Sequence, residues 1–328
     1  GEDDTWTVEY STDGLSLAIT YMNATQGWIP TTDDDVTDAP VSPAYNPTGI
    51  FGFGYDDSSY VSLTNLVNSS GVIATDVTGV GTGRRYLTAG EYGYDKGIFG
   101  FGNNGSNVGM TNLVSSSGVV ATDVTAVGTA RTGPAAATYG GDKGIFGFGN
   151  DGSRVGTTNL VSNAGVVASD VTGVGTGREQ LGACEYSSGK DKAIFAYGNT
   201  GSVTAISNLV SNAGVVASDV TGVGTARATV SACGYGLDKG IFGFGNSGGA
   251  KSMTNLVSNV GVISTDVSGV GTARFDLAAT QYGEDKGIFA YGYSTTAVSN
   301  LVSNTGVVAS DVSGVGTARW AIAACSWG

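Results

Sequence analysis

The sequence predicts an all-β protein built mainly from six similar units. The motif GIFGFG, or a close variant of it, recurs every 47 to 49 residues, beginning at Gly49, Gly97, Gly144, Ala193, Gly240 and Gly287. Self-similarity at a spacing of this kind is typical of repeat architectures. The composition also disfavours helices, because 55 residues are glycine and no apolar pattern with a period of 3.6 residues is sustained.

One full unit, residues 274–318, contains four short apolar runs that are typical of strands. These runs are LAATQY at 277–282, GIFAYG at 287–292, SNLVSNTGVV at 299–308 and SDVSGVG at 310–316. They are rich in Val, Ile, Phe and Tyr, and Gly, Asn, Asp and Ser separate them. Each unit is therefore expected to form a four-stranded antiparallel meander.

The two ends of the repeated region suggest how the units assemble. The last ten residues, RWAIAACSWG, provide a first strand without the rest of its unit, whereas Gly49 begins a unit that lacks a first strand. Meanders with two apolar faces can be stabilised by radial repetition around a channel, and a β-solenoid is the alternative. We predict a six-bladed β-propeller over residues 49–328, closed by pairing of the C-terminal strand with the segment near residue 49.

The order of motifs within a unit resembles that of kelch-type β-propellers. An arginine precedes a strand of small residues, a turn, GIFGFG, a variable loop, and then NLVSNTGVVASDV and GVGTAR. The unit length also agrees with that class. Gly-Phe-Gly or Ala-Tyr-Gly stands where kelch units have a glycine pair, and their late tryptophan is missing. The resemblance implies an architecture but no particular function, because propellers serve many functions.

Charged residues that recur in every unit are interpreted as framework. A lysine next to an aspartate precedes five of the six anchors. An arginine lies eight residues after an aspartate in each unit, and the arginines are Arg84, Arg131, Arg178, Arg227, Arg274 and Arg319. A catalytic residue is seldom needed six times, so we expect ion pairs between blades or hydrogen bonds that stabilise turns. An aromatic residue eight positions after each arginine is assigned to the framework for the same reason.

The three cysteines occupy one position of the repeat. Cys184, Cys233 and Cys325 each lie six residues after a framework arginine, where the other units have Gly, Ala or Thr. A position that accepts only small side chains is expected to be tightly packed. We therefore predict buried free thiols and no disulfide framework.

Variation between units concentrates in the loop after GIFGFG and in the two residues after each framework arginine. In an up-and-down meander both segments lie at the same end of the sheets, so they are expected to form one variable face. Aromatic rings beside Asn, Asp and Ser suit a sugar, although neutral variation of surface loops is the alternative. The candidate ligand-binding residues are Tyr55, Tyr60, Tyr86, Phe275, Asp276, Tyr293 and Trp320.

Residues 1–48 lie outside the repeats. Segment 1–31 contains three expected strands, in TWTVEY, LSLAITYM and GWIPT. YMNATQGW, at 21–28, resembles the ends of β-rich modules in glycine-rich bacteriophage tail fibre and virion proteins. That resemblance implies an assembly handle that contacts other virion subunits. Segment 32–48 is expected to be an acidic, Pro-containing linker; its TDDDVTD run lacks the Gly and distal Glu of an EF-hand loop, so no metal or other cofactor is predicted.

Charge and composition narrow the possible functions. The net charge of −13 disfavours nucleic acid as a partner, and no apolar run is long enough to insert into a membrane. The absence of histidine excludes Ser-His-Asp catalysis. We predict a non-enzymatic adhesion protein at a virion or extracellular surface that binds a host-surface glycan or receptor. A purely structural virion or surface-layer component is the alternative, and a glycosidase using Glu179 and Asp276 is a minor one.

Overall fold

The computed structural model describes residues 18–23, 27–32 and 48–327, and the chain divides into the units Gly1–Tyr45 and Asn46–Gly328. In the first unit, β1 (Ala18–Asn23) pairs antiparallel with β2 (Gly27–Thr32). These strands confirm two of the three expected in the N-terminal segment. The third, in TWTVEY, and the aspartates of TDDDVTD lie outside the described residues.

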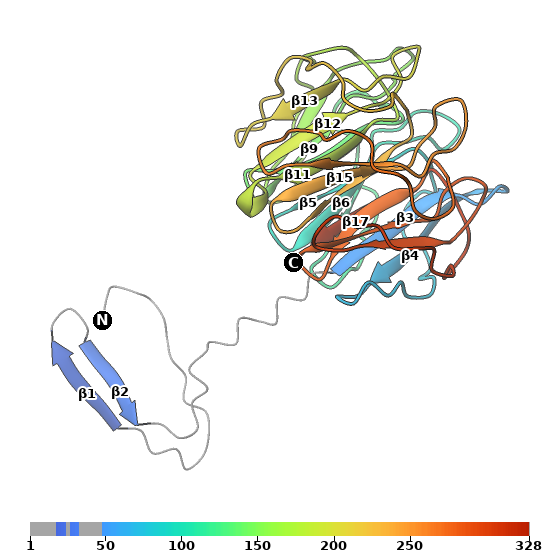
Figure 1. Ribbon diagram of the computed structural model, residues 1–328. Coiled ribbons are helices and arrows are strands. Elements are labelled where there is room, and N and C mark those ends of the chain that lie inside the picture. The colour runs from blue at the N-terminus through green and yellow to red at the C-terminus, as the bar shows by residue number, and fades with distance from the viewer. Residues whose placement is uncertain (1–17, 24–26, 33–47, 328) are drawn as a thin grey trace. The chain divides into compact units, whose positions relative to one another are not determined.

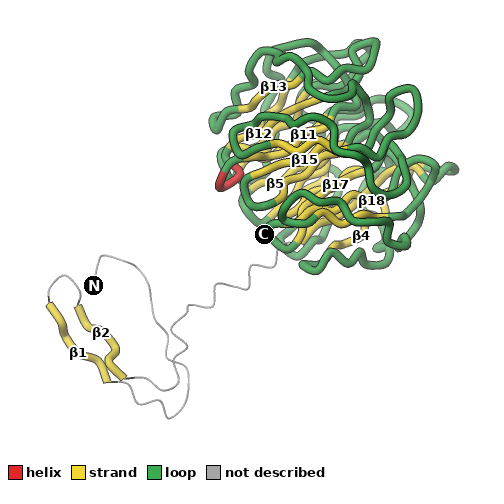
Figure 2. The backbone as a smooth tube through the Cα atoms, in the orientation of Figure 1, coloured by secondary structure: helices red, strands yellow, loops and turns green. Residues whose placement is uncertain are grey.

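The second unit contains six three-stranded antiparallel sheets, one for each repeat (Figure 1). Sheet 1 comprises β20 (Ala323–Trp327), β3 (Thr48–Tyr55) and β4 (Tyr60–Val67). Sheet 2 comprises β5 (Thr88–Tyr92), β6 (Lys96–Gly100) and β7 (Thr111–Val114). Sheet 3 comprises β8 (Ala135–Tyr139), β9 (Lys143–Gly147) and β10 (Thr158–Val161). Long loops join the strands (Figure 2).

Sheets 4, 5 and 6 repeat the same order. Sheet 4 comprises β11 (Gly182–Tyr186), β12 (Lys192–Ala196) and β13 (Ser207–Val210), with a short helical turn, η1 (Ser188–Lys190), between β11 and β12. Sheet 5 comprises β14 (Ser231–Tyr235), β15 (Lys239–Gly243) and β16 (Thr254–Val257). Sheet 6 comprises β17 (Ala278–Tyr282), β18 (Lys286–Ala290) and β19 (Ser299–Val302).

The C-terminal strand completes the sheet that begins at residue 48. Cys325 of β20 lies opposite Ile50 of β3, and Trp327 lies opposite Thr48, which confirms the predicted pairing. β3 lies beside β17 although the two strands come from opposite ends of the repeated region (Figure 1). The first strands of sheets 2 to 6 and β20 of sheet 1 contact one another in sequence, and β20 contacts both β17 and β5. The arrangement is therefore propeller-like, with small-residue strands innermost.

The prediction of four strands per unit is wrong, because the last apolar run and the end of the third run form only isolated bridges. In sheet 1, Thr64 exchanges two backbone hydrogen bonds with Val77, and Val67 bridges Ile73. Between these bridges the side chain of Asn65 donates to the carbonyl oxygen of Ala74 at 3.0 Å. The Asn65 side chain thus donates to a carbonyl oxygen that would accept a backbone N–H in a regular β-ladder. The other five units contain equivalent bridges.

Neighbouring sheets approach closely because glycine or alanine alternates with aromatic residues in the middle strands. A Cβ atom on Gly100 would lie 2.9 Å from the ring of Phe146 in the next sheet. Beside this contact, the rings of Phe101 and Phe146 are 5.3 Å apart and nearly perpendicular. Equivalent aromatic pairs occur at all six junctions, including Phe51 with Tyr291 between sheets 1 and 6.

Each framework arginine is buried between two sheets. Arg84 donates from Nε to the carbonyl oxygen of Phe101 at 2.8 Å and from Nη2 to Asn112 at 2.7 Å. Its guanidinium also stacks on Phe53 of the preceding sheet, with 4.3 Å to the ring centroid. Burial lowers the pKa of Arg84 to about 10, so the side chain stays charged at neutral pH.

The aspartate partner of each arginine is the one in the same unit, not the one eight residues before it. Arg84 lies 4.0 Å from Asp123, and Asp76, eight residues before Arg84, is instead 3.9 Å from Arg319. Both groups of the pair adjoin sheet 2, so the expectation of ion pairs between blades is wrong, whereas that of hydrogen bonds that stabilise turns is confirmed. Asp123 also accepts hydrogen bonds from the backbone and hydroxyl of Thr82, which ties the turn before Arg84 to the next sheet.

The cysteine prediction is also confirmed. Cys184, Cys233 and Cys325 are buried and free. A Cβ atom on Gly97 would lie 2.6 Å from the sulfur of Cys325, so the thiol fills a space that glycine leaves on the adjoining sheet. Burial raises the pKa of all three thiols, and they are therefore unreactive packing groups.

Candidate functional site

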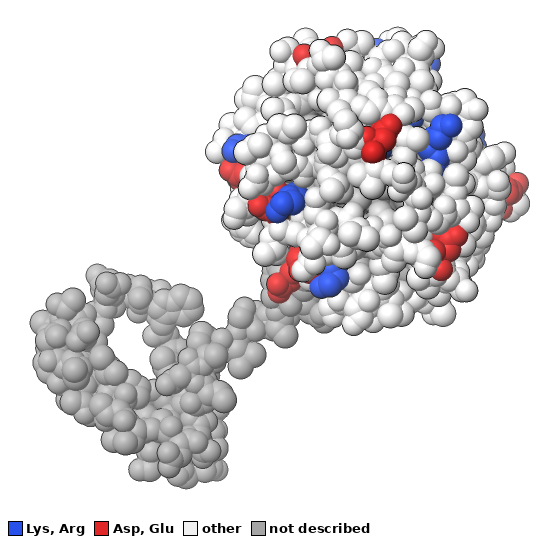
Figure 3. Space-filling view, viewed as in Figure 1, with Lys and Arg blue, Asp and Glu red and all other residues white. Residues whose placement is uncertain are grey.

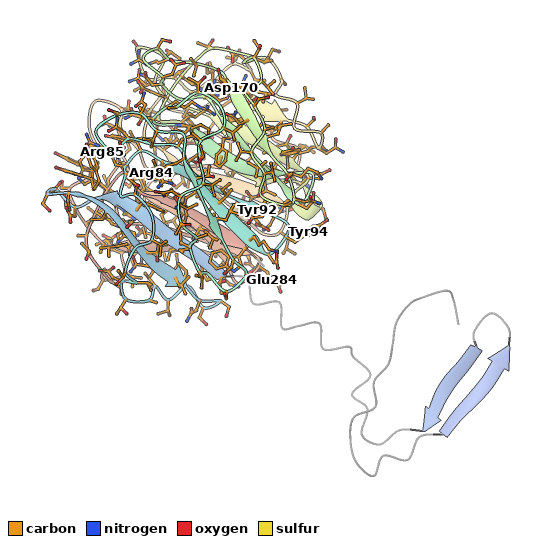
Figure 4. The ribbon with its side chains drawn as sticks, turned by 180° about the vertical axis from the view of Figure 1, so that it is seen from behind. Arg84, Arg85, Tyr92, Tyr94, Asp170 and Glu284 are labelled. Carbon is orange, nitrogen blue, oxygen red and sulfur yellow. The ribbon has the colours of Figure 1, made fainter. Side chains whose placement is uncertain are left out.

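The two variable segments of each repeat lie side by side at one end of the sheets. In every sheet, the residue after the framework arginine forms a bridge with a residue that follows the middle strand or ends it. These pairs are Arg85–Asn103, Thr132–Asn150, Glu179–Asn199, Ala228–Asn246, Phe275–Tyr293 and Trp320–Tyr55. In Figure 4, Arg84 and Arg85 lie at the opposite end of the second unit from Tyr92, Tyr94 and Glu284.

The second residue after each arginine lines the mouth of a central cavity. All six have positive φ values, between 51° and 62°: Tyr86, Gly133, Gln180, Thr229, Asp276 and Ala321. Five backbone hydrogen bonds of 2.7–2.9 Å link them from sheet to sheet, for example from the Tyr86 N–H to the Ala321 carbonyl oxygen. The cavity has a volume of about 110 Å³ and is lined by the first residues of all six innermost strands. Sequence comparison of the repeats identified these positions as variable but not as a ring.

All seven candidate residues from the sequence belong to one connected cluster, which we call the aromatic face. The centroid of the Trp320 ring lies 5.5 Å from that of Tyr55, 5.9 Å from that of Tyr86 and 5.6 Å from that of Tyr293. Tyr60 lies 5.4 Å from Tyr55, and Phe275 stacks on Tyr293 at 4.8 Å. Tyr86 hydrogen bonds to Asp276. The cluster draws on sheets 6, 1 and 2, so it forms where the two ends of the repeated region meet.

The rings of the aromatic face are partly exposed and held in place by polar contacts. Tyr293 is 44% exposed, whereas Trp320 is half-buried. The indole N–H of Trp320 donates to Asp57 at 2.8 Å, and the hydroxyl of Thr295 donates to the same carboxylate. These hydrogen bonds lower the pKa of Asp57, which therefore stays ionised. Asp57 and Thr295 were not among the sequence candidates, although both lie in the variable loops.

Arg85 is the principal residue of the face that sequence reasoning missed. Its guanidinium lies over four rings, with centroid distances of 5.1 Å to Tyr55, 5.5 Å to Tyr60, 5.3 Å to Tyr86 and 5.2 Å to Trp320. Its Nε atom is buried without a hydrogen-bond partner. The available signal was the doubled arginine at positions 84–85, since no other repeat has a basic residue after the framework arginine.

Asp276 lies at the cavity mouth and is 8% exposed. Burial raises the pKa of its carboxyl to about 7, although nearby Arg85 and the hydrogen bond from Tyr86 act in the opposite direction. The carboxyl is thus partly protonated at neutral pH. By contrast, Glu179 is ionically paired with Arg154 at 3.0 Å and accepts a hydrogen bond from Asn150.

Replacing Asp276 with asparagine is expected to stabilise the protein more at pH 8 than at pH 5. In wild type the unfolded carboxyl ionises near pH 3.8 and the folded one near pH 7, so stability falls as the pH rises between these values. Asparagine does not titrate, can still accept a hydrogen bond from Tyr86, and tolerates positive φ. The extra gain in unfolding free energy at pH 8 should be on the order of 2 kcal/mol, measured by urea denaturation.

Asp151→Asn is the matched control for this experiment, because Asp151 is exposed in the loop that follows β9. Its effect on the free energy of unfolding should be similar at both pH values. An Asp276→Asn effect that is equally independent of pH would contradict the assignment of a buried, weakly acidic carboxyl to Asp276.

A second cavity, of about 40 Å³, lies among the innermost strands, and Glu91, Glu185 and Gln281 are among the residues that line it. Glu91 is 5% exposed and forms an ion pair of 2.7 Å with Lys190, while burial raises the pKa of its carboxyl to about 7.

Across the part of the chain that the structure describes, no three His, Cys, Asp or Glu residues are grouped as metal ligands. Acidic and basic side chains are scattered over a largely uncharged surface in the view of Figure 3.

Comparisons with known proteins assign no family to this chain. No protein-family model matches it, and no curated protein matches it at a significant level. Within the described residues, no helix has both the length and the apolar character needed to cross a membrane.

Proposed function

We propose that the second unit is a closed six-bladed β-propeller of kelch-like repeats. Its support is the assignment of one three-stranded sheet to each repeat, the pairing of β20 with β3, and the contacts of β20 with both β17 and β5. A closed ring leaves no terminal sheet face exposed, which a linear stack of six sheets would do.

We further propose that this propeller is a non-enzymatic recognition protein whose aromatic face binds a glycan on a host surface. One observation carries the proposal: six partly exposed aromatic rings from three adjoining sheets converge at one end, and hydrogen bonds hold two of them, Trp320 and Tyr86. The C–H faces of a sugar can stack on such rings, and the nearby carboxylates and amides can bind its hydroxyl groups. Fixing the rings before binding reduces the entropy that the complex loses.

The proposed location is a virion appendage such as a tail fibre, or another extracellular surface. The similarity of YMNATQGW to the ends of phage fibre modules supports this location. In such an appendage, residues 1–48 would contact other subunits and the aromatic face would be open to solvent.

Binding to a glycan array and to intact candidate host cells tests the proposed recognition function. The double substitution Tyr86→Ala, Trp320→Ala is expected to abolish wild-type binding, or to weaken it at least tenfold, because both rings belong to the central contacts of the face. Tyr293→Ala should also weaken binding and, at a more exposed site, perturb folding less. Retained binding in all of these variants would contradict the proposal.

Tyr94→Ala is the matched control, because Tyr94 is 63% exposed and lies at the opposite end of the innermost strands (Figure 4). It should bind as wild type does. Melting temperatures of all variants must be compared, so that loss of binding is not confused with loss of folding.

A structural role in an assembly is the second candidate function, and exposed valines favour it. One valine at the same position of each repeat is between 59% and 65% exposed: Val72, Val119, Val166, Val215, Val262 and Val307. An apolar residue repeated around the outer edges could contact neighbouring subunits. If wild type binds neither glycans nor cells, this structural function replaces recognition.

A further inference from the structure

Among the described residues of the second unit, Arg85 differs from most of the other cations in forming no ion pair. Four lysines pair with the aspartate that precedes them, Arg154 pairs with Glu179, and Lys190 pairs with Glu91. Among the described residues, no carboxylate forms an ion pair with Arg85, and no acceptor receives a hydrogen bond from its side chain. Its backbone alone is paired, with Asn103.

The aromatic rings fix this unpaired guanidinium in one place. A planar guanidinium stacks on aromatic faces and keeps its N–H groups in a rigid fork that matches a carboxylate. Four rings lie within 5.5 Å of Arg85, and Trp320 is itself anchored by Asp57. Arg85 is half-buried as a whole, so part of the side chain can still be reached from solvent.

The carboxyl groups of Asp276 and Asp57 form no ion pair with Arg85. Asp276 interacts with Arg85 electrostatically, but its buried carboxyl is partly protonated at neutral pH. Asp57 is ionised, and its two oxygen atoms are engaged by the Trp320 indole and the Thr295 hydroxyl. Neither carboxyl group forms an ion pair with Arg85, so the guanidinium keeps N–H donors for a carboxylate of a ligand.

We propose that Arg85 binds the carboxylate of an acidic sugar residue whose ring stacks on the neighbouring rings of the aromatic face. This inference rests on the proposed glycan-binding function and adds the chemical class of the ligand. The stacked sugar contributes apolar contact, and the bidentate pair with the guanidinium selects acidic over neutral sugars. Since the pair forms next to apolar rings, it should be stronger than an exposed ion pair.

The test compares matched glycan pairs that differ only in the acidic group. The probes are sialylated and desialylated N-acetyllactosamine, and oligosaccharides ending in glucuronate or in glucose. Wild type is expected to bind at least one acidic member at least tenfold more tightly than its neutral partner. Arg85→Gln should remove that preference, and Arg85→Lys should restore only part of it because lysine lacks the planar fork. Added salt should weaken binding of the acidic glycan more than binding of its neutral partner.

The possible outcomes distinguish the role of Arg85 from the proposed glycan-binding function. Equal binding of acidic and neutral members, unchanged by Arg85→Gln, would overturn the role of Arg85 and leave glycan binding intact. Failure of wild type to bind any glycan or cell would overturn both. Lys96→Gln serves as a control, because Lys96 pairs with Asp95 next to Tyr94, at the opposite end of the innermost strands from Arg85 (Figure 4), and its loss should not change the preference.

Discussion

Replacing Arg131 with methionine is expected to lower the free energy of unfolding by about 3–5 kcal/mol. The guanidinium is fully buried, and it donates to the carbonyl oxygen of Phe148 at 2.7 Å, to Asn159 at 2.6 Å and to the carbonyl oxygen of Thr129 at 3.2 Å. It also stacks on Phe101 at 3.9 Å. Methionine fills similar space but leaves these acceptors without a donor, and each unsatisfied buried group costs roughly 1–3 kcal/mol.

Arg154→Met is the matched control for this prediction. Arg154 is partly exposed and pairs with Glu179 at the surface, so its loss should cost no more than about 1 kcal/mol. Equilibrium urea unfolding of both variants and of wild type measures the difference. Equal, small effects in the two variants would show that the framework arginines are not what holds adjoining sheets together.

Deleting residues 320–328 is expected to abolish cooperative folding of the second unit. The deletion removes β20, which is the innermost strand of sheet 1 and contacts the innermost strands of sheets 2 and 6. Ile322, Ala323, Cys325 and Trp327 are all buried in the native chain. The loss should exceed about 5 kcal/mol, since burying one large apolar side chain contributes about 1.5–3 kcal/mol and a domain is stable by only about 5–15 kcal/mol.

Deletion of residues 1–45 provides the comparison, because these residues form a separate unit. That variant should keep the main thermal transition of wild type, as followed by circular dichroism and calorimetry. A synthetic peptide of residues 320–328 should partly restore folding of the C-terminal deletion by strand addition. A C-terminal deletion that melts at the wild-type temperature would refute the stabilising role of the pairing between β20 and β3.

Much of the fold could be predicted because the six repeats act as an internal comparison. The strands in GIFGFG and in the small-residue run were located by their apolar pattern, and the pairing of β20 with β3 followed from matching two incomplete units. The fourth strand was predicted wrongly, since its residues have a strand-like composition. The hydrogen bonds from Asn65 to the Ala74 carbonyl and to Asp76 compete with a ladder there, and composition alone does not show them.

The candidate site was predicted in part. Variation between repeats, combined with the order of strands, identified the seven residues that the structure joins into the aromatic face. Arg85 was missed because its proposed role depends on its spatial neighbours, which come from distant parts of the chain. Four rings from sheets 1 and 2 surround it, and no carboxylate of the described residues forms an ion pair with it; a linear sequence shows neither fact.

Local patterns were therefore sufficient to identify the repeat, most strands, the framework positions and the small-residue slot of the cysteines, because each depends on residues close together in the chain. Contacts between distant residues settled the rest. They pair Arg84 with Asp123 instead of Asp76, bring Tyr55 against Trp320, and leave Asp276 buried beside Arg85 at the cavity mouth. Burial and partner choice are properties of the assembled sheets, since the same side chain has a different charge state and different neighbours once water is excluded.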